Sequence, residues 1–218
     1  MTPPRSFPSD LCLDSPRLQL RPMRHGDAAQ WLAIMADPEV MRYWHHAPWQ
    51  DLAEAESALA ADREAYANGD QLKLGMYRRD NGELIGMVQL FNIDDISRRG
   101  EIGYCLASAV QGRGYMDEAL TCFIDYLAHT LHMRRLEGEI DPRNQGSART
   151  LERQGFVLEG TLRARWCVAG ELSDSGIYGL LLEPGCRATH PRPRAPVQYS
   201  QSLSDNNVAH RGGPKRND

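Results

Sequence analysis

The 218-residue sequence contains no long apolar run and no apolar leader. A membrane-spanning helix needs roughly 20 consecutive apolar residues, and no stretch approaches that length, so no membrane partner is expected. Residues 1–10 lack the apolar core of a signal peptide. Apolar residues make up 41% of the chain and charged residues 25%, as in ordinary globular proteins. The sequence therefore predicts a cytoplasmic protein with one domain and a substantial core.

Cysteine pairs and metal-ligand clusters are also missing. The five cysteines are odd in number, lie far apart and include no Cys-x-x-Cys pair, which argues against a disulfide framework or a zinc site. Cys105 lies in an apolar stretch and is predicted to be a small core residue rather than a nucleophile. The pairs His45-His46 and His129 with His132 have no carboxylate or cysteine at ligand spacing. No metal site is therefore expected.

Charge is concentrated at the C-terminal end. Residues 185–218 carry a net charge of +4. Since the whole chain has a net charge of −4, residues 1–184 carry a net charge of −8. Prolines, few apolar residues and no periodicity predict a disordered tail. This tail could contact nucleic acid, or it could be a solvated appendage without a partner. Its charges are dispersed and hardly interleaved with aromatic residues, which favours the solvated appendage, so no nucleic-acid partner is expected. The predicted organisation is a flexible N-terminus (1–10), one folded domain (11–184) and this basic tail.

Strand and helix patterns alternate only in the middle of the chain. Apolar or alternating stretches predict strands at residues 17–21, 72–78, 83–91, 101–106, 135–140, 156–158, 163–168 and 171–182. Helices are predicted at residues 27–36, at a restart beginning Asp37-Pro38, at 51–66, at 117–131 and just after Asn144. Because the ends form hairpins, the fold class is α/β (α+β), a mixed sheet with helices on both faces.

A glycine-containing loop joins the strand at 101–106 to the helix at 117–131; its sequence is Val110-Gln111-Gly112-Arg113-Gly114-Tyr115-Met116. A strand, a loop and a helix start bring free backbone N–H groups together, which suits a phosphate-rich ligand. The glycines permit a tight turn, and Gln111 and Arg113 add donors. The alternative is that the glycines are ordinary turn residues. Neither the Walker-type nor the dinucleotide-binding fingerprint is present.

Two blocks of sequence resemble the GNAT N-acetyltransferases. Gln111-x-x-Gly114 after Tyr104-Cys105-Leu106 resembles their acyl-CoA pyrophosphate loop, Gln/Arg-x-x-Gly-x-Gly/Ala, although Met116 replaces the last small residue. Residues 141–160 resemble the RimJ/RimL branch, with Asn144-x-x-Ser147, then Leu151-Glu152-Arg153-Gln154-Gly155-Phe156, then Glu159-Gly160. Arg163, Asp174 and Tyr178 also fall where that branch often has these residue types. The resemblance covers residues 16–183, in the order of the family.

The resemblance implies a mostly antiparallel sheet of seven strands or so, in which the parallel strands 101–106 and 135–140 splay apart. It implies an acetyl-CoA-dependent N-acetyltransferase, with a ribosomal-protein N-terminus or a small amine as acceptor and no metal. The oligomeric state is open between monomer and homodimer. The implied coenzyme-binding residues are Tyr104, Cys105, Leu106, Gln111, Gly112, Arg113, Gly114, Tyr115, Met116, Asn144 and Ser147.

Candidate catalytic groups follow from the chemistry of amide formation. Glu101 is the first choice as general base, because a charged residue that begins an apolar central strand needs either solvent or a function; Glu159 is the reserve, although a surface turn also explains it. The resemblance implies Ser147 or Tyr178 as the acid. A tyrosine pKa near 10 suits a thiolate leaving group, but core packing is the alternative for Tyr178. A backbone N–H near Leu106 would bind the oxyanion.

Other residues are expected to shape the site. Asn144 can cap the short helix that follows it, and the resemblance adds binding of the pantetheine arm, a compatible role. Trp44, Trp49 and Trp166 are candidates for the acceptor pocket. Two other functions stay open: an inactive acyl-CoA-binding sensor on the same fold, and a ribosome-associated protein that binds through its basic tail.

Overall fold

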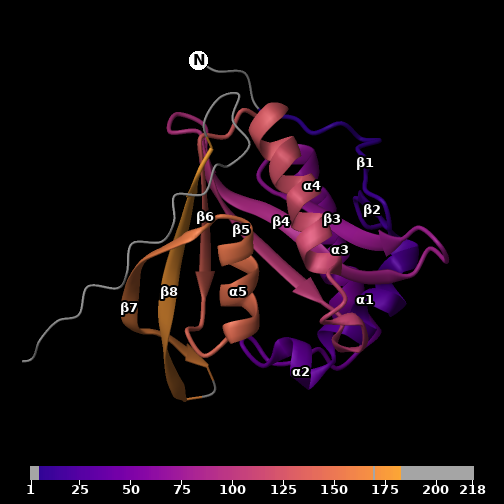
Figure 1. Cartoon of the computed structure of the whole chain (residues 1–218). Coiled ribbons are helices and arrows are strands. Elements are labelled where there is room, and N and C mark those ends of the chain that lie inside the picture. Colours follow the sequence, from indigo (N-terminus) through magenta and orange to yellow (C-terminus); the bar gives the residue numbers. More distant parts are fainter. Residues whose placement is uncertain (1–4, 169, 183–218) are drawn as a thin grey trace, which may run out of the picture.

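The computed structural model describes residues 5–168 and 170–182, which form one eight-stranded sheet with helices on both faces (Figure 1). The strand order is β1-β2-β3-β4-β5-β6-β8-β7, and every neighbouring pair is antiparallel except β5 with β6. The strands are β1 (Leu13–Asp14), β2 (Leu18–Arg21), β3 (Leu72–Arg78), β4 (Leu84–Asp94), β5 (Arg99–Leu106), β6 (Arg135–Ile140), β7 (Val157–Val168) and β8 (Glu171–Leu181). The predicted fold class is confirmed.

Two differences from the predicted strands have local causes. β1 was not predicted, because two residues show no alternation. The strands expected at residues 156–158 and 163–168 are instead one strand, β7, whose pairing with β8 shifts register between Leu158 and Gly160 and again between Leu162 and Trp166. The Glu159-Gly160 pair, which suggested a turn, is accommodated as a bulge within the strand.

Helices cover the sheet in two sets. The helices α1 (Ala28–Met35), α2 (Pro38–Met41) and α3 (Leu52–Asn68) belong to one layer, and α4 (Tyr115–His129) and α5 (Gln145–Arg153) to the other (Figure 1). Short 3₁₀ turns, η1 (His25–Asp27) and η2 (Ser108–Val110), precede α1 and the loop before α4. Asp51 and Glu54 form a capping box at the start of α3, and Gly69 ends that helix in the left-handed region at φ +77°.

The core consists of two apolar layers, one on each side of the sheet. α4 contributes Ala119, Phe123 and Leu127, all fully buried at a spacing of four residues, as its sequence predicts. The other layer includes Trp31 of α1 and Leu59 of α3, which are each 1% exposed. Burial of each such large side chain contributes about 1.5–3 kcal/mol. The sheet is therefore packed against apolar side chains on both of its faces.

The N-terminal segment is part of the folded unit from Arg5 onward. Phe7 is 8% exposed, and its ring lies 5.3 Å from that of Tyr66 on α3. The Arg5 guanidinium donates to the Gly69 carbonyl at 2.9 Å. The Phe7 side chain therefore anchors this segment to α3. The predicted tail at 185–218 lies outside the described residues.

Within residues 5–168 and 170–182, no helix combines the length and the apolar character needed to cross a bilayer. The same residues contain no group of three or more histidine, cysteine or carboxylate side chains placed to hold a metal ion.

Candidate active site

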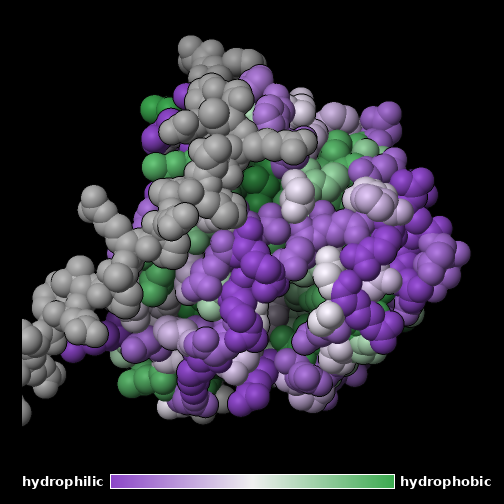
Figure 2. All heavy atoms as spheres, in the orientation of Figure 1, coloured by the Kyte–Doolittle hydropathy of each residue, from purple (hydrophilic) through white to green (hydrophobic). Residues whose placement is uncertain are grey.

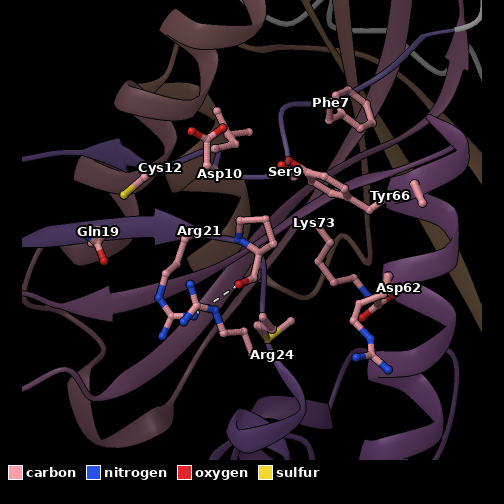
Figure 3. Close-up of a pocket in the computed structure, with 15 residues that line it drawn as sticks. Phe7, Ser9, Asp10, Cys12, Gln19, Arg21, Arg24, Asp62, Tyr66 and Lys73 are labelled. Atoms are coloured by element: carbon pink, nitrogen blue, oxygen red, sulfur yellow. Dashed lines mark hydrogen bonds and ion pairs between the residues drawn. The ribbon is translucent and has the colours of Figure 1, made fainter.

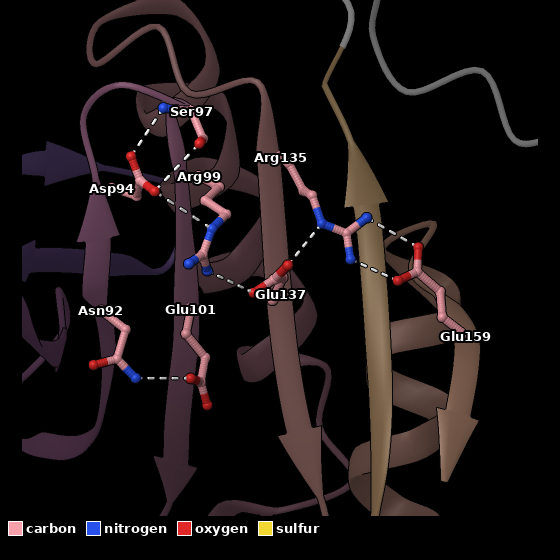
Figure 4. Close-up of polar contacts among 8 residues, drawn as sticks. All are labelled: Asn92, Asp94, Ser97, Arg99, Glu101, Arg135, Glu137 and Glu159. Atoms are coloured by element: carbon pink, nitrogen blue, oxygen red, sulfur yellow. Dashed lines mark hydrogen bonds and ion pairs between the residues drawn. The ribbon is translucent and has the colours of Figure 1, made fainter. Parts of the chain in front are cut away.

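The central parallel strands pair over only a short stretch. β5 and β6 are in register from Arg99 opposite Arg135 to Glu101 opposite Glu137, and no later pair joins them in the described part of the chain. β5 stays bonded to β4 as far as Leu106, and β6 stays bonded to β8. Figure 4 shows the two strands diverging beyond Glu101. The predicted splay is therefore present between residues 102–106 and 138–140.

The splay leaves a backbone donor of β5 without a strand partner among the described residues. The Ala107 N–H donates to the Ile85 carbonyl of β4 at 2.8 Å. Successive residues of a strand direct their N–H groups to opposite sides, so the Leu106 N–H points to the side where β6 no longer pairs. This is the direction that the predicted oxyanion donor near Leu106 needs, and its role stays a prediction.

The loop before α4 has an open outer surface. Gly112 and Gly114 have φ values of +73° and +77°, where other residues are strained. A Cβ placed on Gly112 would meet nothing within 4 Å, and one on Gly114 would meet only the Arg17 guanidinium, at 3.6 Å. The glycines therefore allow a ligand to approach the backbone closely. In the space-filling view, apolar side chains are visible in a hollow between α5 and the start of α4 (Figure 2).

The start of α4 is well suited to bind an anion. Gly114 is its N-cap and provides no side-chain cap, so the N–H groups of the first turn lack intrahelical acceptors and lie at the positive end of the helix dipole. The two carboxylates of this turn are balanced by arginines: Arg153 Nε lies 3.0 Å from Asp117 Oδ2, and Arg17 Nε lies 2.6 Å from Glu118 Oε2. An incoming phosphate would therefore meet donors without uncompensated negative charge.

A hydroxyl pair connects α5 with β5. Asn144 caps α5, since its Oδ1 accepts a hydrogen bond from the Ser147 N–H at 3.0 Å. The Ser147 hydroxyl lies 2.7 Å from that of Tyr104. Burial raises the pKa of Tyr104 above its usual value, so the phenol stays protonated. The structure thus brings Tyr104, Asn144 and Ser147 together beside the splay, as the predicted coenzyme site requires.

Tyr178 occupies a buried position on β8, opposite Gly138 of β6. It is 6% exposed, and its hydroxyl has no hydrogen-bond partner among the described residues. Burial, and then the nearby Glu152 carboxylate, raise the pKa of Tyr178. The side chain packs in the core, as the core-packing alternative predicted, and no described residue accepts its phenol proton.

Other predicted coenzyme residues take structural roles. Gln111 Nε2 donates to the Leu106 carbonyl at 3.1 Å and closes the loop onto the end of β5. Met116 is 8% exposed and packs in the core under α4, so its bulk points away from the open surface of the loop. Cys105 belongs to the opposite apolar layer, and burial raises the pKa of its thiol to about 12. Cys105 can therefore reach a coenzyme only through its backbone.

Glu101 lies on the sheet face that carries the charged side chains of β5 and β6. Burial raises the pKa of Glu101 above its ordinary value, and the carboxylates of Glu139 and Glu137 add to this rise. The Asn92 amide opposes the rise by donating to Glu101 Oε2 at 3.0 Å (Figure 4). A half-buried carboxylate of raised pKa suits a general base.

Glu159, the reserve base, is committed to an ion pair. Arg135 donates to both of its oxygens, at 2.9 Å and 2.5 Å, and also to Glu137 Oε1 at 2.7 Å (Figure 4). The hydrogen bonds from Arg135 lower the pKa of Glu159 despite its partial burial. A carboxylate held in this way is a weak proton acceptor, so the structure favours Glu101 over Glu159.

The predicted acceptor tryptophans separate into two environments. Trp166 of β7 stacks on His45, with ring centres 5.7 Å apart, and its Nε1 donates to Glu139 Oε1 at 2.6 Å. Trp49 instead packs edge-on against Trp31 in the core, at 5.9 Å. Trp44 lies beside His45, with ring centres 6.0 Å apart. Trp166 is therefore the tryptophan placed next to the carboxylates around Glu101.

Sequence patterns did not identify two polar residues of the site. Asn92 holds Glu101 from a position in β4 where φ is +49° and the pairing with β5 shifts register. Arg17 contacts the loop before α4 although it lies 96 residues from Arg113 in sequence. The tolerance of asparagine for positive φ was an available signal for Asn92; nothing local marks Arg17.

A cavity of about 520 Å³ lies elsewhere, between the N-terminal segment, β2 and α3 (Figure 3). Phe7 and Tyr66 form one end, and the Lys73 ammonium pairs with Asp62 Oδ1 at 2.7 Å in its wall. None of the predicted coenzyme or catalytic residues lines it. The cavity is therefore separate from the splayed strands.

Comparisons with known proteins identify the family. The acetyltransferase (GNAT) domain matches residues 17–157. An uncharacterized N-acetyltransferase of Bacillus licheniformis is 31% identical over 165 residues, which cover 76% of this chain and 93% of that protein. The ribosomal protein uS5 alanine N-acetyltransferase of Escherichia coli (strain K12) is 28% identical over 142 residues, covering 61% of this chain and 73% of that one.

A solved structure shows the same fold. The crystal structure of a GCN5-related N-acetyltransferase from Brucella melitensis superposes with a TM-score of 0.70 at 25% identity, and the match covers 82% of this chain and 81% of that one. The resemblance predicted from the two sequence blocks is thus confirmed. With its open helix start beside a splayed parallel pair, this chain belongs to the GNAT acetyltransferase family and is an N-acetyltransferase.

Proposed function

We propose that the protein transfers an acetyl group from acetyl-CoA to a primary amine by direct attack, with both substrates bound together. The observation that carries the proposal is the uncapped, glycine-lined start of α4 beside the point where β5 and β6 separate. An anion site next to unpaired strand ends suits a ligand that has a diphosphate at one end and a thioester at the other.

Coenzyme binding is assigned to residues on the α4 and α5 side of the sheet. The backbone N–H groups from Gly112 to Met116 would hold the diphosphate. Asn144 would bind the pantetheine arm through its Nδ2, which donates to no acceptor in the described residues while Oδ1 caps α5. Free space above both glycines supports this fit, because a Cβ at either one has no backbone neighbour within 4 Å.

The reaction forms an N–C bond and breaks a C–S bond. The acceptor must first lose a proton, and the Glu101 carboxylate takes it, directly or through water. The Leu106 N–H stabilises the negative charge that develops on the carbonyl oxygen. The departing thiolate takes a proton from a hydroxyl, and that hydroxyl regains one from the attacking nitrogen as the neutral amide forms. Tyr178 suits this step better than Ser147, whose hydroxyl is already paired with Tyr104.

The acceptor approaches from the face of the sheet that carries Glu101. Glu139 and Trp166 border this face, and the His45 ring closes it from the segment between α2 and α3. We infer a protein N-terminal α-amine or a small primary amine as acceptor. The relative that acetylates an alanine of ribosomal protein uS5 supports the first of these.

A screen of amines tests the proposal. Peptides with N-terminal alanine or serine and a set of small primary amines are incubated with acetyl-CoA, and free thiol release and the mass of the acceptor are followed. We expect thiol release that depends on the amine, together with an acetylated product. Binding of CoA without turnover on any amine would instead favour the inactive acyl-CoA sensor. Failure to bind CoA would overturn both.

A further inference from the structure

Arg17, just before β2, reaches the loop that begins α4. Its Nη1 donates to the Arg113 carbonyl at 3.0 Å, and its guanidinium carbon lies 4.4 Å from the centre of the Tyr115 ring. Its Nε lies 2.6 Å from Glu118 Oε2, and its backbone N–H donates to Glu118 Oε1 at 2.7 Å. One side chain thus contacts three residues of the loop and the first helical turn.

These contacts leave one end of the guanidinium available. The five N–H donors of arginine form a rigid planar fork, so fixing Nε and Nη1 also fixes the direction of Nη2. No acceptor for Nη2 exists among the described residues, and the side chain is 46% exposed. Nη2 lies 3.6 Å from the position that a Cβ on Gly114 would occupy. Its donors therefore lie beside the free N–H groups of the α4 start.

Arg17 also compensates a charge that would oppose an anion. Glu118 lies in the first turn of α4, where a bare carboxylate would repel phosphate. Burial alone would raise the pKa of Glu118, but hydrogen bonds from Ser15 and Arg17 outweigh it and lower that pKa. Glu118 is therefore ionised and is the anchor that aims Arg17.

We propose that Arg17 is a binding and positioning residue for the coenzyme: Nη2 donates to a phosphate oxygen, while Nε and Nη1 hold the loop in the shape that presents its N–H groups. The inference rests on the proposed function and goes beyond it by adding a side chain from the other end of the domain to the diphosphate site. Arginine suits the role because its fork can bind a carboxylate and a phosphate together.

Calorimetry with CoA tests the binding role. Arg17→Gln is expected to weaken the affinity roughly 10- to 100-fold, the range for loss of one charge-assisted hydrogen bond. Arg17→Lys keeps the charge but loses the fork, so an intermediate loss is expected. The matched control is Arg63→Gln on α3, an exposed arginine away from the loop, which should bind as the unaltered chain does. Thermal melts establish that each variant is folded.

A truncated donor separates binding from a merely structural effect. S-acetylpantetheine lacks the diphosphate, so Arg17→Gln should leave its kcat/KM nearly unchanged while kcat/KM for acetyl-CoA falls through KM. Equal losses with both donors, or unchanged CoA affinity in Arg17→Gln, would overturn the role of Arg17 while the proposed function stands. If the unaltered chain does not bind CoA, the proposed function and this inference both fall.

Discussion

Replacing Glu101 with glutamine tests the proposed base and also indicates the acceptor class. Glu101 has a pKa raised by burial and by its neighbours Glu139 and Glu137. A general base works in its ionised form, so activity should rise with pH through that raised pKa and the acid limb should lie above the ordinary glutamate range. Glu101→Gln removes the proton acceptor with little change in shape.

The expected loss follows from the fraction of acceptor that is already neutral. At pH 7.4 an alkylamine of pKa ~10.4 is neutral in about one molecule per thousand, whereas an α-amine of pKa ~7.7–8.0 is neutral in about one-fifth to one-third. Without a base only this fraction reacts. Glu101→Gln should therefore cost up to roughly 1,000-fold with an alkylamine but about three- to five-fold with an N-terminal amine. Both penalties should fall to about twofold at the pKa of the acceptor and vanish above it.

Initial rates of thiol release, measured from pH 6 to 10 with one alkylamine and one N-terminal alanine peptide, provide the comparison. Glu159→Gln is the matched control, since its carboxylate is held by Arg135; its pH profile should follow that of the unaltered chain. A rate ratio between the unaltered chain and Glu101→Gln that does not change with pH would refute Glu101 as base. A difference in stability should not account for the result. A carboxylate whose pKa is raised by folding stabilises the folded state at low pH, and this contribution is lost as the pH rises through that pKa. Glu101→Gln should therefore be no less stable than the unaltered chain near neutral pH.

Three further substitutions have distinct expected results. Gly114→Val places a β-branched residue at φ +77°, which costs at least about 1–2 kcal/mol of backbone strain; calorimetry should show no CoA binding by the folded variant, and retained affinity would remove this loop from the site. Asn144→Ala removes the cap of α5 and should lower the free energy of unfolding, measured in urea titrations, by about 1 kcal/mol. The control Glu64→Ala, at an exposed position on α3, should change that free energy by no more than about 0.5 kcal/mol. Equal effects of the two substitutions would contradict the capping role. Tyr178→Phe should lower kcat by roughly 100-fold or more with little change in KM, because it removes a phenol that has no acceptor among the described residues. Since an acid works while protonated and the pKa of Tyr178 is raised, the alkaline limb of the unaltered chain should lie above the ordinary tyrosine range. An unchanged kcat in Tyr178→Phe would eliminate Tyr178 as the acid.

Short-range patterns predicted most of the architecture. The four-residue spacing of Ala119, Phe123 and Leu127 identified the buried face of α4, and Asp51 with Gly69 marked the ends of α3. The turn before α4 and the start of α5 were predicted because glycine, capping and strand signals are local. Each of these signals depends on the conformation of a few consecutive residues, and the folded chain adopts the conformations that they favour.

Contacts between distant segments were not predictable in the same way. Asn92 meets Glu101 only because the β4–β5 pairing shifts register, and Arg17 meets Arg113 only because β2 begins beside the start of α4. The commitment of Glu159 to Arg135 likewise depends on β6, β8 and β7 lying side by side. A single sequence does not encode these juxtapositions locally; they follow from the assembled sheet.

The short parallel contact between β5 and β6 divides the sheet into two lobes joined by a narrow seam. Arg99 crosses it to Glu137, 3.1 Å away, which reinforces one end, whereas the other end has no main-chain link between the two strands in the described residues. Because few main-chain bonds join the two parts of the sheet here, we expect small opening and closing motions about the reinforced end. A long ligand wedged at the free end would brace the lobes against each other, so occupancy of the site and stiffness of the whole domain should rise and fall together.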